Sequence, residues 1–421
     1  MNYDIDQIRA QFPGLARREG ERAAVFFDNP AGTQIAQGAI DRMVAAMIHR
    51  NANLGGLFTT SVLAMQDVAD AHQAAADFVN ARDPGEVFFG QNMTTLTFAI
   101  SRALGREFQP GDEIVVTRMD HDANVAPWLM LAEDRGLVIK WLDFDLDSYE
   151  FDLDQLKPLL SPRTKLVAVG YASNLTGTIN DIAAISAMAH AAGALVYVDA
   201  VQFAPHGVID VQALDCDFLV CSAYKFFGPH YGLAWGRREL LERLRPYKVR
   251  PAKDTLPSKF VTGTTNREEL AGVYGAIEYY AWVGDKFGAP AAATRRDRIV
   301  AGVQAMARHD LDLMTRLISG LQALDGVKIL GITDPQAFHR RVPTVSFRAE
   351  GVTTEAIVRH MADKGIYVWH GHNYAIEPCR AMGILDDGGV VRVGLAHYNT
   401  PEEVDWFLSV LVGFLKSNGP G

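Results

Sequence analysis

Residues 196–236, VYVDAVQFAPHGVIDVQALDCDFLVCSAYKFFGPHYGLAWG, carry the pattern that decides the fold. Two apolar, strand-like runs in this stretch each end in polar residues, the first at Asp199 and the second at Ser222, shortly before Lys225. Such apolar runs are typical of strands buried on both faces of a parallel sheet. Ligands of these sheets bind at the carboxyl ends of the strands, so we expect the Asp199 carboxylate and the Lys225 amine to face one crevice.

The same pattern extends along the first 265 residues. Short apolar runs alternate with longer helical patterns, which is typical of βαβ units and predicts an α/β fold with a mostly parallel sheet between helices. The strand-like runs are residues 86–89, 113–117, 138–142, 165–169, 195–198 and 217–221, and the helical patterns are residues 95–104, 126–134 and 182–191.

The pattern changes after about residue 265. Residues 267–282 and 295–324 predict two long helices. After them, residues 327–330, 344–348, 367–369 and 390–394 predict strands, and residues 354–363 and 402–415 predict two further helices. We therefore expect an N-terminal segment that packs on the small domain, a large α/β domain, and connecting helices with a smaller α+β C-terminal domain. Their expected bounds are residues 1–20, 21–265 and 266–421.

The composition excludes several classes of protein. The chain has 421 residues, of which 48% are hydrophobic and 21% charged, as is ordinary for a globular enzyme. Its net charge of −10 argues against a general nucleic-acid-binding protein. Neither a membrane-spanning run nor a secretory signal is found, and no cysteine pattern has zinc spacing. We expect a cytoplasmic protein without a disulfide framework or a metal site.

Lys225 and Asp199 suit the chemistry of pyridoxal phosphate. Burial beside Phe226 and Phe227 would lower the pKa of the Lys225 amine and make it nucleophilic. Asp199 interrupts an apolar run, and a buried carboxylate needs a cationic or hydrogen-bonding partner. Pyridoxal phosphate needs a lysine for its Schiff base and an anion beside its pyridine nitrogen. We therefore predict that both residues are catalytic.

Other strand ends offer the remaining contacts with this cofactor. Residues 90–95, GQNMTT, follow a strand and open a helix, so their backbone N–H groups and threonine hydroxyls predict a phosphate site. Ser222 adds a further hydroxyl to it. His121 is expected to lie flat on the pyridine ring. Asn174 ends another strand, where it reaches the ring hydroxyl or the substrate.

Other interpretations stay open at this point. The sheet alone also suits a nucleotide-binding α/β oxidoreductase, although no GxGxxG pattern follows the first strand. A third hypothesis is a pyridoxal-phosphate-binding regulator without catalytic activity, which the absence of an added DNA-binding region and the negative charge disfavour. Single residues also have structural interpretations, such as helix caps for Thr94 and Thr95.

Short motifs follow one another in a specific order along nearly the whole chain. They are FFDNPAGTQ (residues 26–34), NMTTLTFAI (92–100), DHDANVAPW (120–128), SNLTGT (173–178), VDAVQ (198–202), SAYKFFGP (222–229), TGTTN (262–266) and VRVGLAHYNT (391–400). Together they resemble the aminotransferase class V family of fold-type I pyridoxal-phosphate enzymes, and within it the cysteine-desulfurase-like branch. The resemblance implies a seven-stranded sheet in the large domain.

The resemblance also implies a role for each matching position. Lys225 matches the Schiff-base lysine, Asp199 the partner of the pyridinium nitrogen, and His121 the ring-stacking histidine. Arg392 matches the arginine that pairs with the substrate α-carboxylate, a task that suits its bidentate guanidinium. Thr264 matches a phosphate ligand supplied by the partner subunit, which implies a homodimer. Further cofactor contacts are implied for Thr94, Thr95, Asn174, Gln202, Ser222 and Tyr224.

Residues 369–375, WHGHNYA, depart from the pattern of this branch. Tyr374 stands where cysteine desulfurases carry their catalytic cysteine, and a phenol cannot accept sulfur as a persulfide. Cys379 follows shortly after, and Trp369 replaces an arginine that often precedes the loop. We expect His372 and Tyr374, together with Asn174 and Arg392, to border the substrate. The turn at residues 29–32, NPAG, is expected to approach it from the other side.

We therefore expect an enzyme that acts at the α-carbon of a small-molecule amino acid. Lys225 takes the α-proton, and the next step decides the reaction. A β-elimination of the C–S lyase type is the expected outcome, because it needs no persulfide cysteine. The alternatives are a class V aminotransferase, an epimerase in which Tyr374 or His372 returns the proton from the opposite face, and a true cysteine desulfurase.

Overall fold

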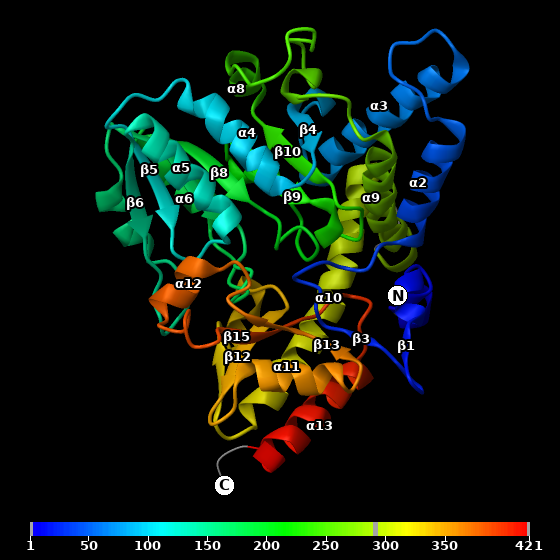
Figure 1. Cartoon of the computed structure of the whole chain (residues 1–421), viewed down its shortest axis with the longest axis vertical. Coiled ribbons are helices and arrows are strands. Elements are labelled where there is room, and N and C mark those ends of the chain that lie inside the picture. Colours follow the sequence, from blue (N-terminus) through cyan, green and yellow to red (C-terminus); the bar gives the residue numbers. More distant parts are fainter. Residues whose placement is uncertain (1–2, 289–293, 419–421) are drawn as a thin grey trace.

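The computed structural model describes residues 3–288 and 294–418, with a seven-stranded sheet at the centre of its larger part (Figure 1). The strand order is β4-β10-β9-β8-β7-β5-β6, and all strands run parallel except β10, which is antiparallel to both neighbours. The predicted α/β class is therefore confirmed. The bounds are β4 (Val87–Gly90), β5 (Glu113–Thr117), β6 (Val138–Leu142), β7 (Thr164–Gly170), β8 (Leu195–Asp199), β9 (Phe218–Ser222) and β10 (Gly232–Gly236).

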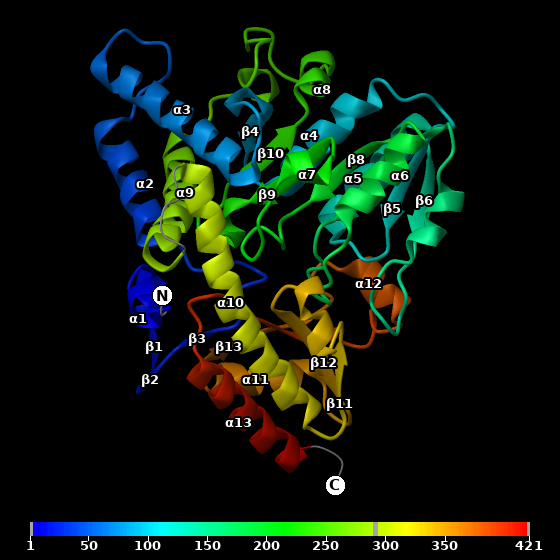
Figure 2. The same ribbon diagram turned by 180° about the vertical axis from the view of Figure 1, so that it is seen from behind.

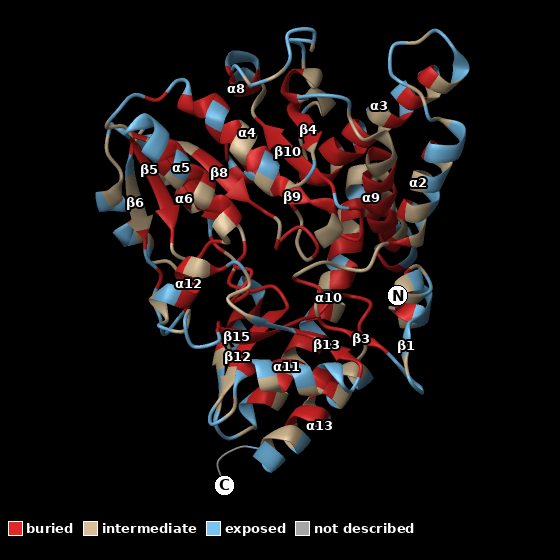
Figure 3. Ribbon diagram, in the orientation of Figure 1, coloured by how far each residue is buried: buried red, intermediate tan, exposed pale blue. Residues whose placement is uncertain are grey.

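Helices cover both faces of this sheet, so its strands are almost entirely buried (Figure 3). Ile114 and Val116 of β5 belong to one apolar cluster and Val115 to the other, as the two-residue period of a strand requires. The first cluster includes α4 (Met93–Gly105) and α5 (Ala126–Arg135), and the second includes α3 (Thr59–Val79) and α6 (Ile182–Ala191). This double coverage explains the continuous apolar runs in the sequence.

Two long helices connect the large sheet with a smaller one. α9 (Arg267–Phe287) packs against α2 (Gln37–His49), and α10 (Arg295–Gln322) runs along α9 to the small domain (Figure 2). The small sheet has the antiparallel order β11-β12-β15-β14. Its elements are β11 (Val327–Leu330), β12 (Thr344–Ala349), β14 (Trp369–Gly371) and β15 (Val390–Gly394), with α11 (Thr354–Ala362), α12 (Ile376–Ala381) and α13 (Pro401–Asn418).

The N-terminal segment contacts both parts of the chain. Arg9, at the end of α1 (Ile5–Arg9), forms an ion pair with Glu403 of α13 at 2.9 Å. Phe12 packs edge-on against Phe227 of the large domain, with ring centroids 5.6 Å apart. The domain bounds at residues 20 and 265 remain a prediction. Within the described ranges, the helices lack the length or the apolar character needed to cross a membrane.

Some local expectations differ from the structure. β10 was not among the predicted strands, because it is short and has a glycine at each end. Residues 367–369, expected as one strand, are divided between two sheets. β13 (Ile366–Tyr367) pairs with β3 (Val25–Phe26), whereas β14 begins at Trp369 and pairs with β15.

Candidate active site

A cleft of about 1000 Å³ lies at the carboxyl ends of the large sheet, with residues of the small domain along its other wall. This edge is where open α/β sheets bind their ligands. All predicted site residues except Thr264 line the cleft: Thr94, Thr95, His121, Asn174, Asp199, Gln202, Ser222, Tyr224, Lys225, His372, Tyr374 and Arg392. The fold thus brings together residues that are almost 300 positions apart in the chain.

Lys225 lies in a short 3-10 turn directly after β9. Its Nζ donates hydrogen bonds to the backbone carbonyls of Pro30, at 2.5 Å, and Ala31, at 2.9 Å. Burial lowers the pKa of the amine to about 7, and the positive charge of Arg392 acts in the same direction. A large fraction of the amine is therefore neutral at neutral pH, which is the form that acts as a nucleophile or base.

Two buried carboxyl groups, Asp199 and Asp120, line the same cleft. Burial raises the pKa of Asp199 to about 6, although Lys225 acts in the opposite direction. Asp120 accepts hydrogen bonds from the Gly170 backbone at 2.8 Å and from Asn124 at 2.7 Å. Burial, with the charge of Asp199, raises its pKa to about 7. A cation between such groups is stabilised, and a protonated pyridine nitrogen is such a cation.

His121 presents a neutral ring to the cleft. Its Nδ1 accepts a hydrogen bond from the Ala123 backbone at 3.0 Å, which places the proton on Nε2. Burial lowers its pKa to about 3, and the cations Lys225 and Arg392 contribute. The ring lies nearly parallel to Tyr374, with centroids 5.5 Å apart and an interplanar angle of 17°. An aromatic cofactor ring thus has a flat partner here.

The N-terminus of α4 borders the cleft where the sequence predicts a phosphate site. Asn92 caps the helix, since its Oδ1 accepts from the Thr95 backbone N–H at 2.9 Å. The Thr95 hydroxyl completes the capping box by accepting from the Asn92 backbone N–H at 3.2 Å. The Ser222 hydroxyl accepts from the Met93 backbone at 3.0 Å. The Thr94 hydroxyl contacts only the Met93 sulfur, at 3.5 Å, among the residues that the structure describes. Thr95 is therefore a helix cap, and Thr94 is the threonine better placed to bind phosphate.

Buried polar atoms without partners surround Arg392. Its Nη1 donates to the Asn174 carbonyl at 3.0 Å, whereas its Nε has no hydrogen-bond partner within the described part of the chain. The same holds for Oδ1 of Asn174 and Oδ1 of Asp28. Burial lowers the pKa of Arg392 to about 10 and raises that of Asp28 to about 6. Buried groups of this kind normally have partners. The Arg392 Nε is a donor that suits a ligand carboxylate, as predicted from the sequence, whereas the oxygens of Asn174 and Asp28 need a donor.

Gln202 and Tyr224 complete the wall of the cleft. Gln202 Nε2 donates to the Thr344 hydroxyl at 2.9 Å, which fixes the orientation of its amide. The Tyr224 ring stacks on His230, with centroids 4.8 Å apart. Lys225 Nζ lies 4.7 Å from the centroid of the Tyr224 ring. Both side chains are thus held in place by protein contacts alone.

A loop of the small domain, residues 372–375, borders the cleft as a lid. Asn373 and Tyr374 have φ values of 49° and 58°, a left-handed conformation that is costly for residues other than glycine. Two hydrogen bonds of 2.8 Å anchor the loop, from Asn174 to the Asn373 carbonyl and from the Asp122 backbone to the Tyr374 carbonyl. The Tyr374 side chain nevertheless remains 68% exposed.

Thr264 and Cys379 lie outside the cleft lining. Thr264 is exposed on the surface. Cys379 is buried in an apolar cluster with Met119 and Leu175, and burial raises its pKa to about 11. The thiol therefore stays protonated and unreactive at neutral pH.

The sequence analysis missed several groups in or beside the cleft. Asp120 precedes His121 in the same strand-end motif, and only the histidine was selected. Asp28 lies in the motif FFDNPAGTQ, which was noted without a role for its carboxyl group. The pattern of side chains did not indicate that the backbone carbonyls of Pro30 and Ala31 would accept hydrogen bonds from Lys225.

Comparison with known proteins agrees with this site. A family model for aminotransferase class-V matches residues 25–407. The chain belongs to the aminotransferase class V family. It is 34% identical to the aminotransferase-like protein FGM3 of Gibberella zeae, over 97% of this chain and 98% of that protein. It is 31% identical to a cysteine desulfurase of Serratia proteamaculans over the full length of both.

Solved structures of class V relatives have the same fold. An apo cysteine desulfurase from Thermococcus onnurineus matches with a TM-score of 0.87 at 26% identity, over 98% of each chain. The cysteine desulfurase CsdA from Escherichia coli matches with a TM-score of 0.84 at 25% identity, over 99% of this chain and 100% of that chain. The fold-type I architecture is therefore confirmed.

As a class V family member, the chain is a pyridoxal-phosphate-dependent enzyme. The cleft fits this cofactor on its own evidence. It holds an amine of lowered pKa, two buried carboxyl groups of raised pKa, a flat neutral ring and a capped helix N-terminus. Lys225, Asp199, His121 and Thr94 are the residues that would hold the aldehyde, pyridine nitrogen, ring and phosphate, respectively.

Proposed function

We propose that this enzyme catalyses a β-elimination of the C–S lyase type on an α-amino acid, without a persulfide cysteine. The observation that carries the proposal is that Tyr374, which the family resemblance matches to the position of the catalytic cysteine, lines the cleft and stacks on His121. All three cysteines are buried and none lines the cleft. A reaction that needs no sulfur acceptor on the protein suits this arrangement best.

The side chains of the cleft support the steps of this reaction. When bound, pyridoxal phosphate supplies an aldehyde that condenses with amines and a ring that accepts electrons from the α-carbon. Arg392 binds the substrate carboxylate through its guanidinium, whose Nε has no hydrogen-bond partner among the described residues. The neutral amine of Lys225 accepts the α-proton. The Asp199 carboxylate keeps the ring nitrogen protonated.

Whether elimination follows depends on which bond breaks after Lys225 has taken the α-proton. The α-proton stays on Lys225, and the β-substituent leaves with its bonding electrons as a thiolate or sulfide. With cysteine as substrate, hydrolysis of the remaining fragment gives pyruvate and ammonia. No residue of the protein changes its oxidation state in this sequence.

An epimerase is the alternative with a specific observation in its favour. The exposed Tyr374 ring lies over the cleft, and its backbone N–H is bonded to His372, so both residues border the substrate space. Either residue would have to return the proton to the face opposite Lys225. Aminotransfer and true cysteine desulfuration are the remaining alternatives.

Product analysis on a panel of amino acids tests the proposal. We expect pyruvate and ammonia with sulfide or a thiol, and we expect Tyr374→Phe to keep most of this activity. α-Proton exchange with racemisation, abolished in Tyr374→Phe, would instead identify an epimerase, and a keto acid with aminated cofactor would identify an aminotransferase. Loss of sulfide release in Cys379→Ala would contradict the claim that no cysteine is needed.

The role of Lys225 is tested separately from the reaction type. Borohydride should fix the cofactor covalently on Lys225, and Lys225→Ala should stay colourless with pyridoxal phosphate. Recovery of the reduced cofactor on another lysine peptide would remove Lys225 from its proposed role.

We also propose a homodimer in which Thr264 reaches the cofactor phosphate of the partner subunit. Near Thr264, Arg267 contacts Asn53 in the loop between α2 and α3, at 3.4 Å (Figure 1). Large apolar side chains are exposed around this loop: Val44, Met47, Ile48, Leu54, Leu57, Phe58, Val62 and Met65. Such gathered apolar surface is typical of interfaces. A cytoplasmic location remains a prediction.

A further inference from the structure

Two hydrogen bonds hold the amine of Lys225 in a defined position. Its two hydrogen bonds end on the successive carbonyls of Pro30 and Ala31. A neutral amine has two N–H donors and one lone pair. Because the two carbonyls use both donors, the lone pair is the one direction left for the cleft, where a base or nucleophile needs it.

Backbone carbonyls can hold the amine in position only if their own turn is fixed, and Asn29 fixes this turn. Asn29 is 4% exposed. Its Nδ2 lies within hydrogen-bond distance of the Phe26 carbonyl at 2.9 Å, the Gly394 carbonyl at 2.8 Å and Asn399 Oδ1 at 3.1 Å. All the hydrogen-bonding capacity of this amide is therefore used to fix the residue immediately before Pro30.

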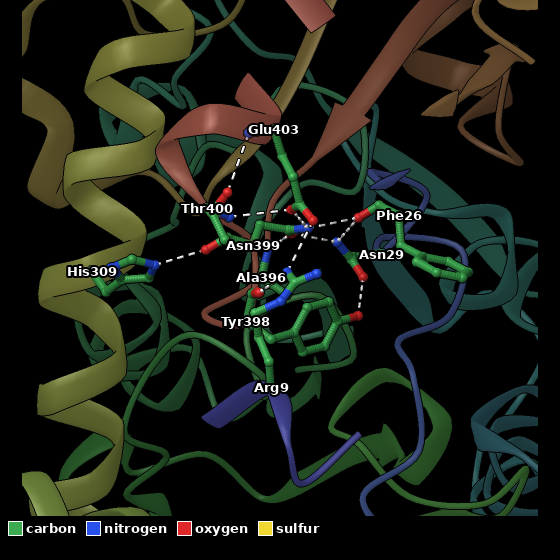
Figure 4. Close-up of polar contacts among 9 residues, drawn as sticks. All are labelled: Arg9, Phe26, Asn29, His309, Ala396, Tyr398, Asn399, Thr400 and Glu403. Carbon is green, nitrogen blue, oxygen red and sulfur yellow. Dashed lines mark hydrogen bonds and ion pairs between the residues drawn. The ribbon is translucent and has the colours of Figure 1, made fainter. Parts of the chain in front are cut away.

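Tyr398 fixes the same turn from its other side. The Tyr398 hydroxyl donates to Asn29 Oδ1 and accepts from the Gln34 backbone at 3.1 Å, so one buried hydroxyl connects both ends of the turn. Figure 4 shows this hydroxyl beside Asn29. Thr33, between them, donates through its backbone N–H to the Tyr224 carbonyl at 3.0 Å, next to Lys225 itself.

The network continues to the two ends of the chain. Asn399 Nδ2 donates to Glu403 at 2.9 Å, and Arg9 donates to the Tyr398 carbonyl at 2.7 Å while pairing with Glu403 (Figure 4). The turn before Pro30 is thus fastened to α1, to the segment after β15 and to α13. These elements are connected to the turn that holds Lys225 through two buried side chains, Asn29 and Tyr398.

We propose that Asn29 and Tyr398 are positioning residues, which hold the Pro30 and Ala31 carbonyls so that the free amine of Lys225 presents its lone pair to the cleft. The inference rests on the proposed role of Lys225. The same orientation serves two events, attack of the amine on the cofactor aldehyde with loss of water and, later, acceptance of the α-proton. Neither residue touches the reacting atoms.

The rate at which cofactor-free protein captures pyridoxal phosphate tests this proposal. The readout is the visible absorption band that appears as Lys225 and the cofactor join, so it requires no amino-acid substrate. We expect capture by Tyr398→Phe to be at least about tenfold slower, because misaligned reacting groups lose about that much or more. Asn29→Ala should be slower still, and Tyr398→Phe is decisive if Asn29→Ala does not fold.

Tyr197→Phe is the matched control. Tyr197 is as fully buried as Tyr398, and its hydroxyl donates to Thr97 at 2.7 Å, away from the turn. Both variants should lose stability to a similar extent, whereas only Tyr398→Phe should slow capture. Wild-type capture by Tyr398→Phe and Asn29→Ala, or equal slowing in Tyr197→Phe, would overturn the proposal. Capture by Lys225→Ala at the wild-type rate would show instead that the lysine assignment is wrong.

Discussion

Asp199 and Asp120 are carboxyl groups whose raised pKa values couple folding to pH. In an unfolded chain the pKa of an aspartate is about 3.9, whereas burial raises it to about 6 in Asp199 and about 7 in Asp120. Between these values the folded protein binds more protons than the unfolded chain. Their contribution to stability is therefore present at low pH and is lost as the pH rises through the folded pKa values.

We predict that the free energy of unfolding of the cofactor-free protein falls between about pH 4 and pH 7. Each group contributes up to about 1.4 kcal/mol per pH unit until the pH passes its folded pKa, about 6 for Asp199 and about 7 for Asp120. Asp199→Asn should reduce this slope, since the amide does not titrate. Urea unfolding at a series of pH values measures it. Above pH 7 the lowered pKa of Lys225 contributes a slope of opposite sign.

An unchanged slope in Asp199→Asn would show that this carboxyl group is ionised in the cofactor-free protein. Asp120→Asn offers the comparison within the same cleft. The cofactor-bound protein should show a weaker pH dependence, because the protonated ring nitrogen stabilises the charged form of Asp199.

The first turn of α4 contains two threonines with different proposed roles. Thr95 stabilises the helix, and Thr94 binds the phosphate. The Thr95 hydroxyl completes the capping box, so Thr95→Ala removes one hydrogen bond and should lower the free energy of unfolding by about 0.5–1.5 kcal/mol. Thr94→Ala leaves the cap intact and should weaken pyridoxal-phosphate binding about tenfold, the value of one hydrogen bond to a charged group. Equilibrium dialysis and thermal unfolding of both variants check the division. The reverse result would assign the phosphate to Thr95.

Elements with a local signal were predictable from the sequence, and elements that depend on distant partners were not. β5 and β7 read as apolar runs because both of their faces are covered. β10 has only five residues and forms because β4 and β9 hydrogen-bond to its two edges. The division between β13 and β14 likewise depends on β3, more than 300 residues earlier in the chain.

The candidate site shows the same contrast. Lys225, Asp199 and His121 were predictable because each follows a strand whose end the sequence marks. The position of the Lys225 amine was not predictable. It depends on two backbone carbonyls, which are held by a contact between Asn29 and Tyr398 across 369 positions. The family pattern located Arg392, but only the structure gives its unpartnered Nε.

At the level of the assembly, the proposed homodimer makes each cleft depend on two chains. We predict that Thr264→Ala and Lys225→Ala are each impaired in cofactor capture, while a hybrid of the two regains one normal site. In that hybrid, the Thr264→Ala chain keeps its own Lys225 and receives Thr264 from its partner. Mixing the unfolded variants, refolding them together and measuring the visible band checks this.

Mixed protein with no more signal than Thr264→Ala alone would contradict the exchange of residues between subunits. A mixture of wild type with Lys225→Ala is the control for refolding yield.

The hydrogen bonds that join the Asn29 turn to residues 394–403 have a consequence for biosynthesis. A chain still emerging from the ribosome makes Lys225 and the whole large sheet long before it makes Tyr398 and Asn399. Until those last residues arrive, the turn lacks the hydrogen bonds that Asn29 makes with Gly394, Tyr398 and Asn399. Competence to take up the vitamin-derived coenzyme therefore comes late in synthesis, when the first and last helices meet.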